Sequence, residues 1–180
     1  MRSGIPVKII GPLASPNNNQ RGGPSVAEVL KEALNKIYRE SLMALITAIA
    51  NDFFAACETG KGWEVCKTYC APNATFAAQA EPLAGIKTLA EYADWMKGLM
   101  TIMPDGSYEV KSFATDTERN NVAAYAVFSG THTGPGGPCE PTGKKTASDY
   151  VYVMQFTDEK ISHMTKIWHS GVALKELGWG

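Results

Sequence analysis

Three histidines are the side chains of this sequence best suited to moving a proton, namely His132, His163 and His169. Imidazole alone has an unperturbed pKa near neutrality, so each histidine is a candidate general acid or base. His169 lies where the last predicted strand meets a short terminal helix, and we predict catalytic roles for His169 first and for His132 second. The alternative for each is a hydrogen-bonded structural histidine, and the sequence leaves that choice open.

A second group of residues could hold a ligand instead of reacting with it. Strand alternation divides residues 147–156 between two faces, and one face carries Tyr150, Tyr152, Met154 and Phe156. Asp149 belongs to the opposite, valine-rich face, and either face could be the core. We predict that the tyrosine face lines a pocket, because tyrosine packs its ring and still offers a hydroxyl group. Gln79 stands in an apolar segment and could supply a neutral hydrogen bond.

Aromatic and methionine side chains at helical spacing add apolar surface. They are Trp63, Tyr92, Trp95, Met96, Met100 and Met103. Methionine adapts to irregular shapes. We predict that Trp63, Tyr92 and Trp95 contact a substrate, although the same spacing is also typical of a plain hydrophobic core.

The segment from Gly134 to Lys145 is rich in Gly and Pro and resembles a phosphate-binding loop only superficially. That motif needs a glycine where this chain has Pro138, and a Ser or Thr where it has Lys145. A strand follows, so no helix N-terminus is offered to a phosphate. We therefore predict a hairpin loop at the rim of a sheet.

The four cysteines are Cys57, Cys66, Cys70 and Cys139. They form no CxxC motif and have no histidine near them in sequence, so zinc is not expected. We predict free, mostly buried thiols in a reducing compartment. The N-terminal apolar stretch is short and broken by Pro6, which does not suit a secretory signal, and we predict a cytoplasmic protein.

The composition excludes several classes of protein. Lys plus Arg total 17 and Asp plus Glu total 18, for a formal net charge of -1, which argues against nucleic-acid binding. No run of about 18 apolar residues is present, so no membrane contact is expected. Hydrophobic residues make up 44% and charged residues 19% of the 180 residues, which is a globular balance.

Helical periodicity dominates the first half of the chain. Capping boxes at Ser25–Glu28 and Thr88–Glu91 mark two helix starts. The predicted helices cover residues 25–57, 63–70 and 88–103. Pro72 is predicted to end the second helix, and residues 75–80 to be extended. Residues 1–24, rich in Pro and Gly, are predicted to form an extended arm.

The second half changes to the two-residue period of strands. The predicted strands cover residues 108–115, 122–133, 147–156 and 160–168, and a short helix over residues 171–178 follows. Because helices and strands are segregated, we predict a single α+β domain over residues 25–180. It would be a cone-like curved antiparallel sheet packed on the N-terminal helices, with a short C-terminal helix. Its concave face would leave a cleft for a small ligand.

Several short motifs resemble a known family over roughly residues 43–180. They are Pro82-Leu83-Ala84-Gly85, Gly130-Thr131-His132-Thr133-Gly134, Pro141-Thr142-Gly143-Lys144, Asp158-Glu159-Lys160-Ile161, Ile167-Trp168 and Leu177-Gly178. With the order of elements, they resemble the SnoaL-like polyketide cyclase group of the nuclear transport factor 2-like superfamily. The resemblance implies ring closure by intramolecular aldol condensation, without a metal or organic cofactor. It also implies an acidic residue that serves as acid/base in the last strand, ahead of the terminal helix, and in this chain His169 or Ser170 takes the place of that acid.

We therefore predict a small-molecule enzyme of the lyase or isomerase type that acts on a hydrophobic carbonyl compound. His169 would move the proton, and Tyr152, Gln79 or His132 would hydrogen-bond the developing enolate oxygen. The alternative is a non-catalytic ligand-binding or assembly module. The resemblance further implies a homodimer formed through the outer face of the sheet, to which the arm could contribute.

Overall fold

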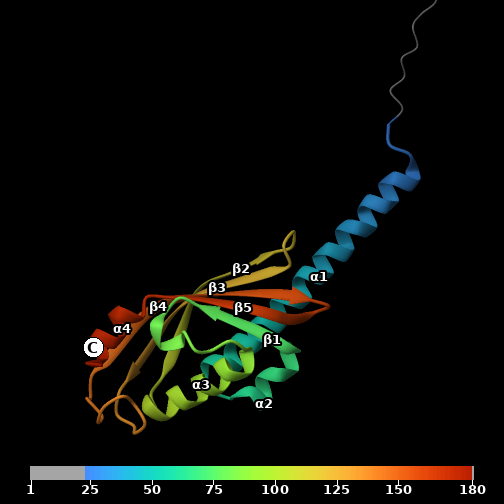
Figure 1. Cartoon of the computed structure of the whole chain (residues 1–180). Coiled ribbons are helices and arrows are strands. Elements are labelled where there is room, and N and C mark those ends of the chain that lie inside the picture. The colour runs from blue at the N-terminus through green and yellow to red at the C-terminus, as the bar shows by residue number, and fades with distance from the viewer. Residues whose placement is uncertain (1–22, 180) are drawn as a thin grey trace, which may run out of the picture. The chain divides into compact units, whose positions relative to one another are not determined.

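Helices come first along the chain and most of the strands follow, as predicted (Figure 1). The computed structural model describes residues 23–179, so the predicted arm over residues 1–24 lies almost wholly outside the described residues. The chain divides into two units, Met1–Asn35 and Lys36–Gly180. Every residue that builds the candidate site belongs to the second unit.

The first helix, α1, covers Val26–Glu58. The predicted capping box at its start is confirmed, because the Ser25 backbone N–H donates to Glu28 Oε2 at 2.7 Å and the Glu28 N–H donates to Ser25 Oγ at 3.3 Å. By length and composition alone, α1 could cross a membrane. Its last turns bury Phe53 and Phe54 in the core of the second unit, whereas most side chains over residues 26–45 are exposed.

The remaining helices are all shorter than α1. They are α2 (Trp63–Cys66), the 3₁₀ turns η1 (Lys67–Tyr69) and η2 (Glu81–Leu83), α3 (Leu89–Ile102) and α4 (Ser170–Leu177). The capping box of Thr88 and Glu91 is confirmed. The predicted helix at 63–70 is shorter than expected, since the chain tightens into η1 and enters a strand at Cys70. Pro72 lies in that strand, which is tolerated because the strand is at the edge of the sheet.

The five strands form one open sheet in the order β1-β5-β4-β3-β2. They are β1 (Cys70–Ala78), β2 (Ser107–Asp116), β3 (Asn121–Thr131), β4 (Lys145–Thr157) and β5 (Lys160–Trp168). Strands β2 to β5 form the predicted antiparallel meander. The extended segment predicted at residues 75–80 belongs to β1, which adds a parallel strand to the predicted antiparallel sheet by pairing with β5. The long connection from β1 to β5 lets the two strands run in the same direction.

The inward face of β4 carries the residues predicted for it. Tyr150, Tyr152, Met154 and Phe156 are all buried. The Phe54 ring of α1 lies parallel to that of Tyr150, with ring centroids 6.1 Å apart, and edge-on to Tyr152 at 5.2 Å. Asp149 lies on the opposite, exposed face and accepts a hydrogen bond from the Tyr125 hydroxyl at 2.7 Å. The concave side of the sheet is therefore an aromatic layer packed on α1 and α3.

Gly134 is required where the long hairpin loop meets the end of α3. A Cβ atom built there would lie 1.9 Å from the Thr101 carbonyl oxygen. We expect Gly134→Ala to lower the free energy of unfolding by about 2–3 kcal/mol, as an overpacked site does. Gly98→Ala is the control, since Gly98 is inside α3 with nothing within 4 Å of its Cβ position. It should raise stability by about 0.5–1 kcal/mol. Urea unfolding of both variants checks this, and equal stability of the two would contradict it.

Candidate functional site

Two ionisable side chains of opposite charge are buried together on the concave side of the sheet. Glu58 ends α1 and is 1% exposed, and Lys166 lies in β5 and is 7% exposed. Strand alternation turns Lys166 inward, as it does Met164 two residues earlier. A buried charge is costly unless it is paired and hydrogen-bonded, so this pair is the most demanding polar feature of the described core.

Two tyrosine hydroxyls connect the two charges, and a third tyrosine bonds Glu58 alone. The Lys166 ammonium donates to the Tyr92 hydroxyl at 2.8 Å, and the Tyr92 and Tyr152 hydroxyl oxygens lie 2.5 Å apart. Tyr152 donates to Glu58 Oε1, and Tyr150 donates to Glu58 Oε2 at 2.6 Å. Residues from α1, α3, β4 and β5 thus form one continuous polar network.

Burial and charge act on the pKa of these groups in opposite directions. Desolvation lowers the pKa of the Lys166 ammonium, and the Glu58 charge partly opposes this. Desolvation raises the pKa of the Glu58 carboxyl, which Lys166 and the tyrosine hydroxyls oppose. Burial also raises the pKa of the Tyr150 hydroxyl, so that it stays a proton donor at neutral pH. A lysine with a lowered pKa can work as a base.

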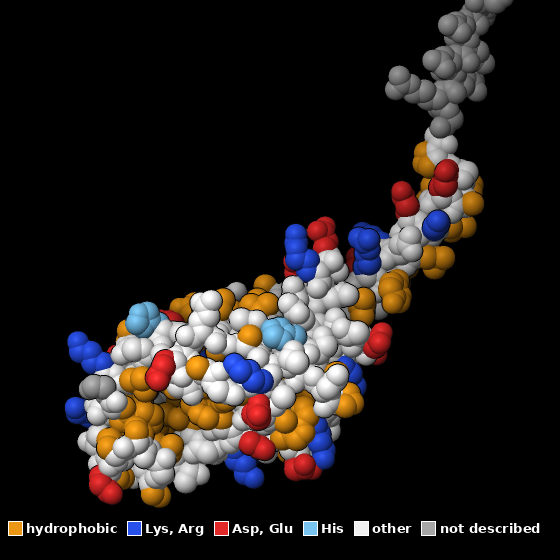
Figure 2. Space-filling model, in the orientation of Figure 1, with side chains coloured by type: hydrophobic (Ala, Val, Ile, Leu, Met, Phe, Trp, Pro, Cys, Tyr) orange, Lys and Arg blue, Asp and Glu red, His pale blue; other side chains and the backbone are white. Residues whose placement is uncertain are grey.

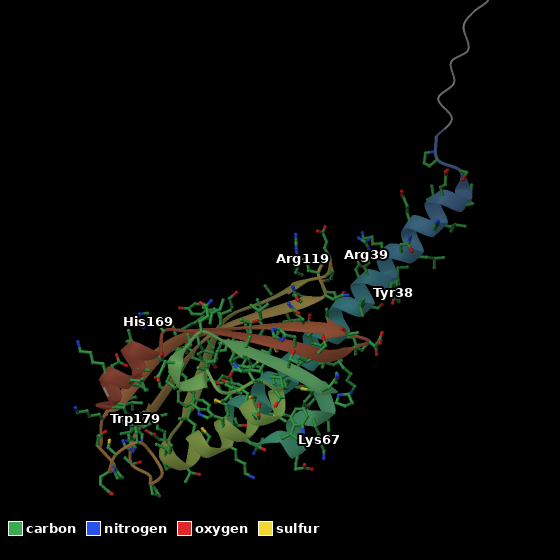
Figure 3. All side chains as sticks on the ribbon, in the orientation of Figure 1. Tyr38, Arg39, Lys67, Arg119, His169 and Trp179 are labelled. Atoms are coloured by element: carbon green, nitrogen blue, oxygen red, sulfur yellow. The ribbon has the colours of Figure 1, made fainter. Side chains whose placement is uncertain are left out.

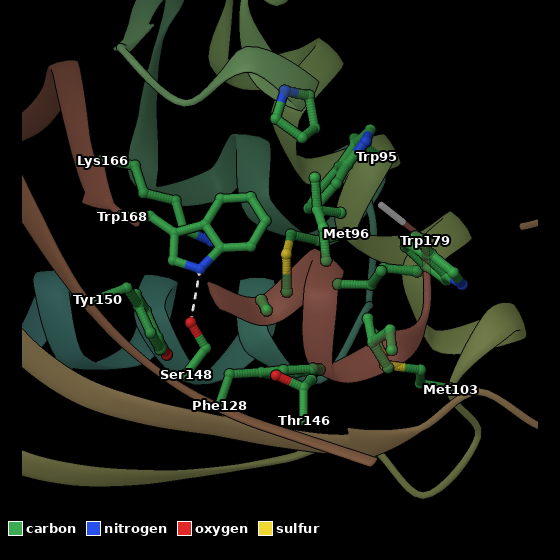
Figure 4. A pocket seen from close by; sticks show the side chains of 15 residues that line it. Trp95, Met96, Met103, Phe128, Thr146, Ser148, Tyr150, Lys166, Trp168 and Trp179 are labelled. Carbon is green, nitrogen blue, oxygen red and sulfur yellow. Dashed lines mark hydrogen bonds between the residues drawn. The ribbon is translucent and has the colours of Figure 1, made fainter. Parts of the chain in front are cut away.

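Aromatic rings surround the Lys166 ammonium. Its Nζ lies 4.8 Å from the ring centroid of Tyr150 and 5.1 Å from that of Trp168. Trp168 is itself held in place, because its indole N–H donates to Ser148 Oγ at 2.7 Å (Figure 4). The ring faces stabilise a cation electrostatically and keep water away from it.

A largely apolar cavity of about 60 Å³ lies against this network. Its polar wall is formed by Thr146, Ser148, Tyr150 and Lys166, and most of the remaining lining is apolar. Figure 4 shows Trp168, Ser148 and Tyr150 on one side of the cavity, with Trp95, Met96 and Trp179 on the other. Lys166 and Tyr150 are therefore the two members of the network that a ligand in the cavity would meet.

A wider groove of about 720 Å³ adjoins the cavity. Both are bounded by Pro82, Trp95, Leu99, Leu174 and Trp179. On the surface, apolar side chains gather in a hollow between α4 and the end of α3 (Figure 2). Small-molecule sites usually measure about 300–1,000 Å³. Cavity and groove together are of that size, whereas the cavity alone is smaller.

The three histidines lie away from the Lys166 ammonium. His169 is exposed, N-terminal to α4, and does not line the cavity or the groove (Figure 3). His163 bonds Thr75 and Thr165 beyond the cavity lining. His132 is fully buried beneath the hairpin loop, where its Nδ1 accepts from the Trp179 indole N–H at 2.9 Å and from the Thr142 N–H at 3.3 Å. His132 thus touches the cavity only through Trp179.

The residues predicted to bind a substrate are spread over several surroundings. Trp95 lines both the cavity and the groove, and Gln79 lines a further pocket of about 420 Å³ beside β5, which shares Lys166 and Trp168 with the cavity. Tyr92 and Tyr152 are fully buried behind the cavity wall, in the polar network. Met154 is buried in the core, and Trp63 packs on its edge. Only Trp95 of the six lines the described cavity.

Sequence reasoning missed Glu58 and Lys166. For Lys166 a signal existed, since a lysine two residues before Trp168 in a strand shares its face, and that face continues the aromatic pocket. Glu58 carried no such signal, because an acidic residue at a helix end is normally solvated. Within residues 23–179, no group of three or more His, Cys, Asp or Glu side chains is arranged to hold a metal ion.

The layered arrangement of a curved sheet over helices, with the polar network and cavity between them, is that of an α+β NTF2-like fold. The sequence model of the SnoaL-like polyketide cyclases matches residues 48–175. The chain belongs to the SnoaL-like polyketide cyclase family.

Solved structures agree with the fold. The candidate SnoaL-like polyketide cyclase from Jannaschia sp. CCS1 has a TM-score of 0.65 and 13% identity, over 77% of this chain and 95% of that one. AclR, a candidate hydroxylase from Streptomyces galilaeus, has a TM-score of 0.62 and 22% identity, over 76% and 82%. A protein with a ketosteroid isomerase-like fold from Catenulispora acidiphila DSM 44928, in complex with trimethylamine, has a TM-score of 0.56 and 17% identity, over 73% of this chain and 93% of that one. No curated protein matches the sequence.

Proposed function

We propose that this protein is a small-molecule enzyme of the lyase or isomerase type, in which Lys166 is the acid/base group acting on a hydrophobic carbonyl compound. The observation that carries the proposal is the position of the Lys166 amine, which is buried, lines the cavity and lies in the last strand. The family resemblance implies an acidic residue as acid/base at the position of His169 and Ser170, and Lys166 lies in the last strand, three residues before His169. Fold alone does not choose the chemistry, since the similar structures include a candidate cyclase and a candidate hydroxylase.

The chemistry follows from the two polar groups that face the ligand. In its neutral form, the Lys166 amine removes a proton from the carbon next to the substrate carbonyl. The resulting enolate oxygen carries negative charge in a site with little water, where a nearby donor is most effective. The Tyr150 hydroxyl lines the same cavity and is a candidate for that donor, for which its single proton turns from Glu58 to the enolate oxygen. For an aldol ring closure, the enolate carbon then attacks a second carbonyl, and the Lys166 ammonium returns the proton to the new alkoxide.

The apolar lining sets the class of ligand. Pro82, Trp95, Leu99, Leu174 and Trp179 border both the cavity and the groove. An apolar, mostly planar compound would bury its surface there while its carbonyl end reaches Lys166. The groove supplies the volume that the inner cavity lacks.

A cyclic carbonyl compound with an acidic C–H bond next to the carbonyl tests the proposal. We expect 2-acetylcyclohexanone to exchange its acidic α-hydrogen in D₂O faster with the protein than with buffer, and to raise the unfolding temperature. NMR measures the exchange. Heat-inactivated protein is the control. Stabilisation without exchange would instead support the ligand-binding module. If the compound neither exchanges faster nor stabilises the protein, both functions are contradicted.

We also keep the proposal of a homodimer formed through the outer face of the sheet, in a reducing compartment such as the cytoplasm. The homodimer is supported by three exposed apolar side chains, those of Val110, Tyr125 and Ile167. The reducing compartment is supported by the buried thiols of Cys57, Cys66 and Cys70, which form no disulfide. Solution mass by light scattering tests the dimer, and a monomer would overturn it.

A further inference from the structure

Tyr92 and Tyr152 lie between Lys166 and Glu58, and neither lines the described cavity. A tyrosine hydroxyl has one proton to donate. Since Tyr152 donates its proton to Glu58, the proton between the two tyrosines must come from Tyr92. Lys166 in turn donates to Tyr92. The three hydrogen bonds therefore all point the same way, from the amine in the cavity wall to the buried carboxylate.

We propose that Tyr92 and Tyr152 form a proton relay between Lys166 and Glu58, so that Lys166 in the cavity wall changes between an ammonium and a free amine by transfer of a proton within the core. The inference rests on the acid/base role proposed above for Lys166. It assigns to the two tyrosines a positioning role, because both act through Lys166 and not on the ligand.

The step balances in protons and charge. An N–H bond of the Lys166 ammonium breaks as an O–H bond forms on Tyr92, whose own proton passes to Tyr152. The Tyr152 proton then passes to Glu58 Oε1. One positive and one negative charge become a neutral amine and a neutral carboxylic acid, and both tyrosines end as they began. The reverse sequence restores the ammonium.

Burial favours such an internal transfer. Glu58 is 1% exposed, and Tyr92 and Tyr152 are fully buried, so a proton held on Glu58 is shielded from solvent. The groups that face the relay are Glu58 and Cys57 from α1, Tyr92 from α3, Tyr150 and Tyr152 from β4, and Lys166 from β5. A hydrogen bond with the Cys66 thiol, together with burial, raises the pKa of the Cys57 thiol, so it remains neutral there. Since the ion pair and the neutral pair both lack net charge, moving the proton does not leave an uncompensated charge in the core.

The relay is tested first with Tyr152→Phe, which removes one hydroxyl from the chain and keeps the ring. With 2-acetylcyclohexanone, we expect kcat to fall at least tenfold while KM changes less than twofold. In mixtures of H₂O and D₂O, a plot of the turnover rate of the wild-type protein against the deuterium fraction should be curved, because several protons move together. In Tyr152→Phe the dependence should become linear. Tyr125→Phe is the matched control, since Tyr125 also donates to a carboxylate but lies on the outer face.

The relay is overturned if Tyr152→Phe keeps both the wild-type kcat and the curved dependence of the rate on the deuterium fraction. It is also overturned if that dependence is linear in the wild-type protein. A second measurement needs no ligand. In protein labelled with ¹⁵N-lysine, NMR gives the titration midpoint of the Lys166 amine. The shift in this midpoint caused by Glu58→Gln should be larger in the wild-type protein than in protein that already carries Tyr152→Phe. Equal movement in both backgrounds overturns the relay. If this coupling is present but the probe is not turned over, the relay stands and the proposed function fails.

Discussion

Replacing Lys166 by methionine is expected to lower turnover of a carbon-acid probe by about 10²–10⁴-fold, the usual contribution of a general acid or base. Methionine keeps the length and apolar stem of the side chain but has no proton to move. Binding of the probe, measured by the shift in unfolding temperature, should persist, because the apolar lining is unchanged. Arginine should not restore turnover, since a guanidinium stays protonated at all working pH values.

The pH profile gives an independent check on Lys166. Because burial lowers the pKa of the Lys166 ammonium below its ordinary value of 10.5, turnover should rise with pH and level off below that value. Glu58 raises the pKa of Lys166, so Glu58→Gln should move the rising limb to lower pH. His169→Ala is the matched control, and it should change neither turnover nor the limb. A loss of turnover in His169→Ala with full turnover in Lys166→Met would restore His169 as the acid/base group.

Glu58→Gln is expected to have the largest effect on stability. It removes the charge that balances Lys166 in the core, and breaking a buried ion pair costs about 3–5 kcal/mol. The double variant Glu58→Gln, Lys166→Met should recover much of this loss, because no charge is then left without a partner. Urea unfolding of the single and double variants measures the difference. A double variant as unstable as Glu58→Gln alone would contradict the explanation.

The loss in Glu58→Gln should also depend on pH. In the variant, the folded pKa of Lys166 lies below the unfolded value, so the unfolded chain binds the proton more tightly. Stability should therefore rise with pH between the lowered pKa of Lys166 and about 10.5, where the amine is neutral in both states. Below that window the full loss is present. A loss independent of pH from neutrality upward would show that Lys166 does not cause it.

Local patterns predicted the elements and the inward face of β4. The two capping boxes involve residues three positions apart, so their partners are visible in the sequence. The alternation that places Tyr150 and Tyr152 inward requires only a regular strand, and β4 is regular across both positions. Trp95, which was predicted to contact a substrate, lines the cavity, and that contact stays a prediction.

The tertiary structure alone decided where the charges meet. Glu58 ends α1 and Lys166 lies in the last strand, and only the packing of α1 against the concave side of the sheet brings them to the same tyrosines. It also decided that β1 joins β5 in parallel and that His169 is exposed. The physical reason is the same in each case. The sequence by itself determines contacts over a few residues through backbone periodicity, whereas burial of a charge depends on which distant elements cover it.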